Sequence, residues 1–503
     1  MDRKSLLLRR PLQAIRELRT HTFNGFINVF HRVAIVPRYC ELMSPQRPLG
    51  NALFDRSPTT RCDWIDQLRG WAVLVMIEVH AFNTWLGPPP AVVPPRLNFL
   101  NGLVAPSFLL CAGFSLVLST FDSRGGLRPF GHTLRRLGFI LLCAYLMHAP
   151  GLSLVDWTLL GTDRKYRGLF QIDVLQCVVY SLLILHGLAR LLRTPLRLGL
   201  AATALLAGVL SISSRVWAMD LASALPLPFA GMVTGLPIPP GPEGVASLFP
   251  LLPWLSFPAL GVVLGTLYFR GRVLLMEGTA AGPDKPTDGS SPTAAPPARA
   301  ALSEVAWLLL LVLVALPAIL WGRSAADTWL LGRGIPDALL GPLHNTTLPS
   351  FAERAGWVCL LGALLGVLSR VGLRSSIMAT LSSESLLVYL FHLFLIYGPL
   401  QLSQVERVLH TGPQRVGWLG TSLLCAVVMA ISTAVGVAWA RVRKDPPRAD
   451  RLRAIGARIL LAYFLLGGWV SVVKFWRRPE LAKKPYYMLK WLGRSAPTSQ
   501  PPG

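Results

Sequence analysis

Charged residues are scarce in this chain. They make up 15% of its 503 residues, whereas 52% are hydrophobic. Soluble proteins carry about 25% charged residues, so the composition excludes that class. Apolar runs of roughly 18 residues or more recur along the chain, and each is long enough to cross a bilayer as a helix. The short alternating segments of a transmembrane β-barrel are missing. The sequence predicts an all-α, polytopic integral membrane helical bundle with about 10–11 transmembrane helices.

Acidic residues are the scarcer of the two charges. The chain has 25 Asp and Glu against 49 Lys and Arg, a net charge of +24. Such a balance can indicate nucleic-acid binding, but the basic residues lie mostly in short loops between apolar runs, as in cytoplasmic loops of membrane proteins. We expect no nucleic-acid partner. The seven cysteines show no paired spacing, so we expect neither a disulfide framework nor a metal site.

A signal-peptide pattern is missing as well. Residues 1–60 form a basic segment that we expect to be cytoplasmic. Within it, residues 12–36 carry a helical apolar stripe and could lie on the inner membrane surface. The alternative is that translation starts at Met43, and the sequence leaves both open.

Candidate spans occupy most of the remaining chain. Their ranges are 67–86, 101–120, 134–150, 173–192, 198–214, 247–268, 302–321, 354–371, 380–400, 417–440 and 456–475. They divide into an N-terminal membrane region, 61–277, with about six spans, and a C-terminal membrane region, 301–475. A Pro-, Gly-, Ala- and Ser-rich stretch, 278–300, separates them and is typical of a flexible cytoplasmic linker. Residues 476–503 are predicted to be a basic, disordered tail.

The positive-inside rule orients these spans. A cytoplasmic N-terminus in the plasma (inner) membrane places most Arg clusters inside, including Arg135 and Arg136. The exception is the basic run that begins at Lys474, which would lie outside. Either the last segment does not cross, or one predicted span is wrong.

One span carries unusual polar residues. It reads IDQLRGWAVLVMIEVHAFNTWL and contains Arg69, Glu78, His80 and Asn83. The eleven steps from Arg69 to His80 make about three helical turns, so both side chains lie on nearly one face, roughly 16 Å apart along the axis. Ionisable groups at membrane depth are costly, and function is their default interpretation.

His80 is the first candidate catalytic residue. Near the midplane, it could take a proton from an acceptor hydroxyl or amine. The alternative is a packing histidine, which the same-face Arg69 and nearby Asn83 make less favourable. Arg69 could hold a phosphate of an anionic cosubstrate, or it could pair with Asp66 or Asp63, and spacing favours neither. Glu78 points away from His80, and we expect it to meet a basic or polar group of another span.

Further polar groups are predicted at the outer ends of neighbouring spans. Asp173 begins the fourth span and could orient His80, as a carboxylate orients a catalytic histidine. It is equally suited to cap a helix. For His148 and Asp156 we favour ordinary helix ends. In a later span, His392 could line the same cavity, as could Tyr389, for which core packing is favoured.

These residues resemble a known family. The runs RCDWIDQLRGWAVLVMIEVHAFNTWL and NGLVAPSFLLCAGFSLVL are similar to the start of bacterial heparan-α-glucosaminide N-acetyltransferase-like proteins, which belong with the acyltransferase-3-related membrane acyltransferases. Weaker matches are DVLQCVVYSLL, FPLLPWLSFPALGVVLG and ESLLVYLFHLFLIYG. The resemblance covers most of residues 61–400.

The resemblance implies transfer of an acyl group, usually acetyl, from cytoplasmic acyl-CoA to a glycan or glycolipid acceptor. The acyl-CoA would be a cosubstrate, and no permanently bound cofactor is expected. His80 would be the catalytic base, Asp173 or Asn83 its orienter, and Arg69, with Arg135 and Arg136, the donor-binding group. Lysosomal members are thought to use a histidine in the first lumenal loop, but the corresponding loop here, 87–100, has none. Direct transfer is therefore preferred.

Two other functions remain to be weighed. A proton-coupled transporter or flippase could use His80, Glu78 and His392 as a proton path, although no internal repeat is visible. A purely structural subunit would tolerate loss of Arg69 and His80. Neither the acceptor, nor the acyl chain, nor O- versus N-acylation follows from the sequence, and a homo-oligomer is compatible with it.

Overall fold

The computed structural model describes residues 62–87, 93–122, 125–149, 168–219, 221–237, 246–280, 297–332, 344–397, 416–459 and 462. The predictions for residues 1–60, for the disordered tail and for most of the last candidate span lie outside this part of the chain. The chain forms two units. In one, the described residues are 450–459, an exposed helical stretch in which Arg453 pairs with Asp450 at 2.8 Å. All that follows concerns the other unit.

Helices make up the described fold. Their bounds are α3 Asp63–Trp85, α4 Pro95–Asn101, α5 Val104–Thr120, α6 Gly131–Met147, α9 Val174–Leu192, α10 Pro195–Trp217, α11 Leu221–Ala224, α12 Leu227–Val233, α13 Leu251–Trp254, α14 Ser256–Ala280, α15 Pro297–Leu331, α17 Leu348–Leu368, α18 Ser376–Ser383, α19 Ser385–Tyr397 and α21 Trp418–Val442. Short 3-10 and π-helical turns lie at His344–Thr346 and Ser369–Leu373. In the described residues, extended pairing is limited to two isolated bridges. The all-α prediction is confirmed.

Most of the predicted spans that fall within the described residues are long apolar helices. Among the described residues, seven helices are long and apolar enough to cross a membrane, and α18 with α19 makes an eighth if the pair, bent by 85°, is one span. The two predicted spans that fall short are α6, which has 17 residues, and α3, whose 23 residues include four Asp, Glu or Arg side chains. The protein is a multi-pass helical membrane protein in which its most polar helix lies inside the bundle.

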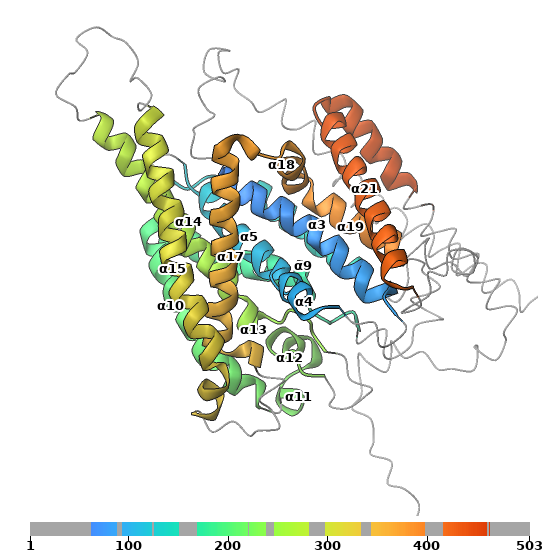
Figure 1. Ribbon diagram of the computed structural model, residues 1–503, viewed down its shortest axis with the longest axis horizontal. Helices are drawn as coiled ribbons and strands as arrows, with labels where there is room; N and C mark the ends of the chain where they lie inside the picture. The colour runs from blue at the N-terminus through green and yellow to red at the C-terminus, as the bar shows by residue number, and fades with distance from the viewer. Residues whose placement is uncertain are drawn as a thin grey trace, which may run out of the picture. The chain divides into compact units, whose positions relative to one another are not determined.

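α3 is the central helix of this unit. It contacts α5, α17, α18, α19 and α21, and Figure 1 shows it between α5 and α17 on one side and α19 and α21 on the other. Leu68, Ala72, Val73, Ile77 and Ala81 along it are 0% exposed. A helix with ionisable residues can occupy such a position because polar groups of the surrounding helices form hydrogen bonds and ion pairs with its side chains.

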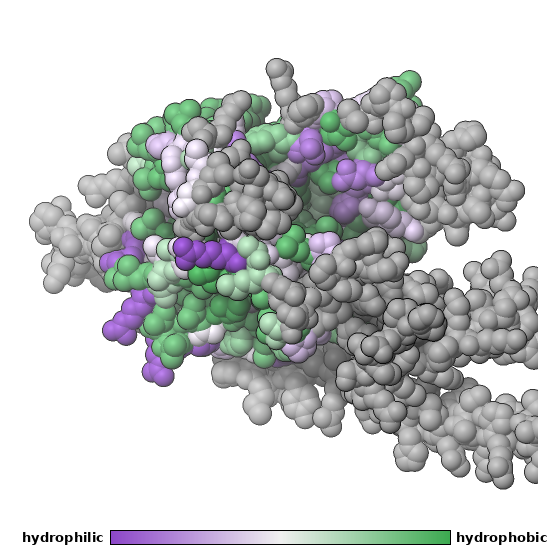
Figure 2. Space-filling model, turned by 90° about the horizontal axis from the view of Figure 1, so that it is seen from below, coloured by the Kyte–Doolittle hydropathy of each residue, from purple (hydrophilic) through white to green (hydrophobic). Residues whose placement is uncertain are grey.

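The two ends of α3 meet different neighbours. At its beginning, which we call the start end, the Gln67 amide donates to Ser375 O at 3.0 Å and accepts from Ser375 N at 3.3 Å. Directly after the C-terminal end of α3, Gly87 N donates to Val416 O at 3.0 Å. The face seen from below is mostly hydrophobic where it is described, with hydrophilic residues in small separate patches (Figure 2).

Candidate functional site

Arg69 is held by α5 at the start end. Its guanidinium donates to Ser115 Oγ at 2.7 Å and to the Cys111 carbonyl at 3.2 Å. The acidic residues suggested as its structural partners have others: Asp63 pairs with Arg374 at 3.2 Å, and Asp66 accepts from Ser382 Oγ at 2.9 Å. Two of its five N–H groups therefore donate to neutral oxygens, and neither of these contacts neutralises its positive charge.

A cavity opens beside this arginine. It has a volume of about 260 Å³ and is lined by Cys62, Ile65, Asp66, Ser115, Leu118, Ser119 and Arg128. Ser115 therefore joins the cavity to Arg69. Arg128 was not selected from the sequence, because a basic loop residue is explained by topology alone.

Further arginines surround the start end. Arg136, exposed on α6, interacts electrostatically with Arg69 and with Arg443, the residue that caps α21. Arg443 pairs at 2.9 Å with Glu384, which is 5% exposed at the bend between α18 and α19. Arg135 is also exposed on α6, and among the described residues no contact joins it to this group. The structure thus groups Arg69, Arg136 and Arg443, and sequence reasoning missed the last.

His80 lies in the second half of α3, facing α19. Its Nδ1 is 3.2 Å from the Tyr397 hydroxyl, and its ring centroid is 5.3 Å from that of His392. His392 is 0% exposed, and its Nδ1 donates to the Val388 carbonyl at 2.9 Å. Its Nε2 is buried and has no hydrogen-bond partner among the described residues. A buried imidazole nitrogen without a partner is costly, which marks this position as prepared for a further donor.

Asp173 joins the same cluster from α9. It caps that helix through Val174 N at 2.7 Å, accepts from the Tyr389 hydroxyl at 3.4 Å and lies 3.6 Å from His148 Nε2. Burial favours protonation of Asp173, but the His148 and backbone hydrogen bonds and the charge of His148 outweigh it and hold the pKa below its usual value. His148, favoured as an ordinary helix end, thus contacts Asp173.

The orienting role predicted for Asp173 has a limited geometric basis. Asp173 interacts electrostatically with His80, but no hydrogen bond joins the two in the described structure, where the group on His80 Nδ1 is Tyr397. Asn83 is exposed and makes no hydrogen bond to His80 within the described residues. Asp156 lies outside them. Tyr397 escaped prediction because 317 residues separate it from His80.

Glu78 belongs to the opposite side of α3. Its Oε1 lies 3.5 Å from Asn101 Nδ2 of α4, in keeping with the polar partner expected from another span. Its Oε2 and Asn101 Oδ1 are buried without partners in the described part of the chain. Glu78 is therefore separate from the His80 cluster.

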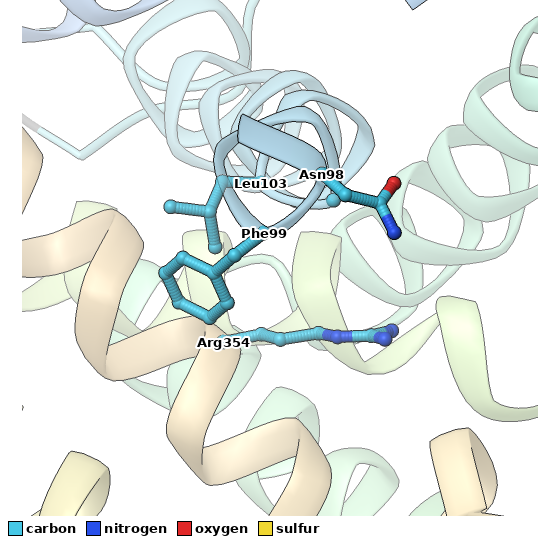
Figure 3. A pocket seen from close by; sticks show the side chains of 5 residues that line it. Asn98, Phe99, Leu103 and Arg354 are labelled. Carbon is cyan, nitrogen blue, oxygen red and sulfur yellow. The ribbon is translucent and has the colours of Figure 1, made fainter. Parts of the chain in front are cut away.

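Residues of α4 about one helical turn before Asn101 line a second cavity. Its volume is about 300 Å³, and Asn98, Phe99, Gly102, Leu103 and Arg354 line it. Figure 3 shows the Asn98 amide and the Arg354 guanidinium extending in the same direction, with Phe99 over the stem of Arg354. Sequence reasoning selected none of these residues.

Residues 61–284 match the family model described as heparan-alpha-glucosaminide N-acetyltransferase, catalytic. Over this region, the chain is similar to that family. The match supports a membrane enzyme of the acetyltransferase type. No curated protein matches the chain.

The matched region contains only part of each cluster. It includes Arg69, His80 and Asp173 but ends before α18, α19 and α21. His392, Tyr397 and Arg443 therefore come to the two ends of α3 from outside the matched residues.

Proposed function

We propose that the protein transfers an acyl group, in the first instance acetyl, from acyl-CoA to a sugar-containing acceptor at or across the plasma (inner) membrane. The observation that carries the proposal is that α3 bears a cationic group at one end and a histidine cluster at the other. The family match to residues 61–284 supports acetyl transfer. The N-terminus would be cytoplasmic, so the start end of α3 would face the acyl-CoA pool.

Donor binding is assigned to the start end. The phosphates of acyl-CoA are anionic, and arginine forms charge-assisted, forked hydrogen bonds to them. Arg69 would bind donor phosphate through the N–H groups that it does not give to Ser115 and Cys111. Arg136 and Arg443 add positive potential there. Arg135, exposed on the same helix, would contribute to attraction of the donor and not to the clamp.

Proton transfer is assigned to His80. In the tautomer whose Nδ1–H donates to the Tyr397 hydroxyl, Nε2 has a free lone pair. Nε2 takes the proton from the acceptor hydroxyl or amine while the acceptor oxygen or nitrogen bonds to the acyl carbon. The C–S bond breaks, and the proton passes to the departing CoA thiolate. Asp173 would stabilise the transient imidazolium electrostatically.

The distance between Arg69 and His80 suits the assignment of donor binding to the first and proton transfer to the second. Arg69 and His80 are eleven residues apart on one unbroken helix, which corresponds to about 16 Å. The phosphates and the thioester of one extended donor would therefore occupy different ends of α3. Asn83, exposed beyond His80, would lie on the acceptor side.

Acyl-CoA binding to the detergent-purified full-length protein tests the proposal. Wild type should bind saturably, Arg69→Ala should bind at least about tenfold more weakly because a charge-assisted hydrogen bond is lost, and His80→Ala should bind normally. Transfer of radiolabelled acetyl to membrane glycans should be lost in His80→Ala.

The controls separate this proposal from transport. Arg215→Ala removes an exposed arginine of α10 and should leave acyl-CoA affinity unchanged. If folded wild-type protein does not bind acyl-CoA but moves protons with a substrate in liposomes, the acyltransferase proposal is wrong. Transfer that persists in His80→Ala would contradict the role of His80.

A further inference from the structure

The cavity between α4 and α17 lies near the first residues of two candidate membrane spans. Asn98 and Phe99 are in the first turn of one candidate span, Leu97–Thr120, and Arg354 is in the second turn of another, Leu348–Leu373. Six residues of helix correspond to about 9 Å, so the Cα of Arg354 is below the end of its span. Long arginine side chains at such positions extend towards the interface.

The direction of Arg354 agrees with this depth. Its Nη2 donates at 2.6 Å to Asn345 Oδ1, which belongs to the turn that precedes α17. Glu353 interacts with it electrostatically, but among the described residues no carboxylate forms an ion pair with it. The guanidinium has five N–H groups, and those not directed at Asn345 can bind an anion that enters the cavity.

The groups beside Arg354 are suited to bind the hydroxyls of a ligand and to contact its apolar chains. The Asn98 amide lines the cavity and is exposed. Its oxygen can accept a hydrogen bond and its NH2 group can donate one. Phe99 is 37% exposed and packs edge-on against Trp357, with 5.5 Å between ring centroids. Apolar surface therefore borders the polar cavity.

We propose that this cavity binds the headgroup of a phosphate-bearing lipid that also carries hydroxyls. The phosphate lies on Arg354, a headgroup hydroxyl lies at Asn98, and the acyl chains continue along the apolar surface beside Phe99. The volume of about 300 Å³ suits a group of headgroup size. That the bound lipid serves as acyl acceptor rests on the proposed function; its binding does not.

Native mass spectrometry of the detergent-purified full-length protein with added lipid tests this proposal. Phosphatidylinositol should bind saturably. Arg354→Gln should weaken that binding at least about tenfold, because one charge-assisted contact is lost, and Arg354→Lys should weaken it less. Phosphatidic acid, which has the phosphate but no headgroup hydroxyls, should bind several-fold more weakly than phosphatidylinositol.

Matched variants and probes make the test decisive. Arg215→Gln, in the last turn of α10, should bind phosphatidylinositol like wild type, and size-exclusion profiles report whether each variant folds. Equal binding by wild type and Arg354→Gln would overturn the proposal, as would equal binding of phosphatidic acid. If inorganic phosphate displaces the lipid at comparable concentration, the site binds free phosphate and the lipid assignment is wrong.

The same preparations keep the two proposals distinct. Acyl-CoA binding without phosphatidylinositol binding would overturn only the lipid site. Lipid binding that depends on Arg354 in a protein that does not bind acyl-CoA would overturn only the transferase proposal.

Discussion

At the scale of single residues, partners decide what each polar group can do. Glu78 and His80 lie two positions apart in the chain, yet Glu78 meets Asn101 of α4 and His80 meets Tyr397 of α19. In a helix, two positions differ by about 200° in direction. One helix thereby serves two different polar neighbourhoods.

Tyr397→Phe should reduce acetyl transfer roughly three- to tenfold while acyl-CoA affinity stays unchanged. The change removes the hydroxyl 3.2 Å from His80 Nδ1, and a single net hydrogen bond has about that effect. Tyr145→Phe, which removes another hydroxyl that pairs with Tyr180 at 2.6 Å, is the matched control. A parallel loss of donor affinity in Tyr397→Phe would contradict the assignment.

Asp173 should make stability depend on pH at the acidic end. Its folded-state pKa lies below the ordinary 3.8, so the ionised group contributes stability that is fully present above 3.8 and is lost as the pH falls through the folded-state value. Thermal unfolding of wild type and Asp173→Asn in detergent should therefore differ most above about pH 5, and the difference should shrink as the pH falls below 3.8. A constant difference would show that the ionised carboxylate is not the cause.

At the scale of elements, close helix contacts depend on small residues. Lipid chains are as apolar as the helix surfaces, so the hydrophobic effect contributes little to the association of membrane helices. The helices associate where their backbones can approach closely. Gly113 of α5 faces the Pro258 backbone of α14, and Gly261 and Gly265 of α14 face α5 in return. These contacts fix α14 against α5, the helix that holds Arg69.

Gly113→Ala should lower stability, because an added Cβ would overlap the Pro258 backbone. Overpacking of this kind costs about 1–3 kcal/mol. Gly187→Ala in α9 meets open space and should be neutral. The thermal unfolding of the two variants is compared in the same detergent. Equal melting temperatures would show that α5 and α14 can move apart without loss of stability.

The bend between α18 and α19 depends on a buried acid. Glu384 is 5% exposed, whereas the side chain of its partner Arg443 is 49% exposed. Removing one partner of such a pair is most costly when the group left behind is buried. Arg443→Gln should therefore lower the melting temperature more than Glu384→Gln, which leaves an arginine that solvent or headgroups can reach. The opposite order would contradict this account.

At the scale of the whole molecule, the family-matched region is structurally incomplete. Residues 61–284 include α3 but none of α17, α18, α19 or α21, which pack around it. In their absence Gln67 would lose Ser375, and His80 would lose Tyr397 and His392. The site belongs to the complete bundle.

A fragment of residues 61–284 should therefore fail to give a monodisperse peak in detergent. Co-expression of fragments 1–290 and 291–503, divided in the predicted linker, should restore acyl-CoA binding, because the contacts of α3 do not require a continuous chain there. A folded, acyl-CoA-binding 61–284 fragment would show that the C-terminal helices are dispensable.

Composition and spacing by themselves determined the helical membrane class, the position of the polar helix and the separation of Arg69 from His80, because these depend on local apolar content and helical periodicity. Within the described residues α3 is not among the helices that are long and apolar enough for a span, because its Asp, Glu and Arg residues lower its hydropathy. Only the tertiary structure decided that Tyr397 and His392 face His80, that Arg443 joins Arg69 and Arg136, and that Arg354 faces a cavity with Asn98. Those groupings arise from helix contacts between residues distant in the chain, and such pairings leave no periodic trace in a single sequence.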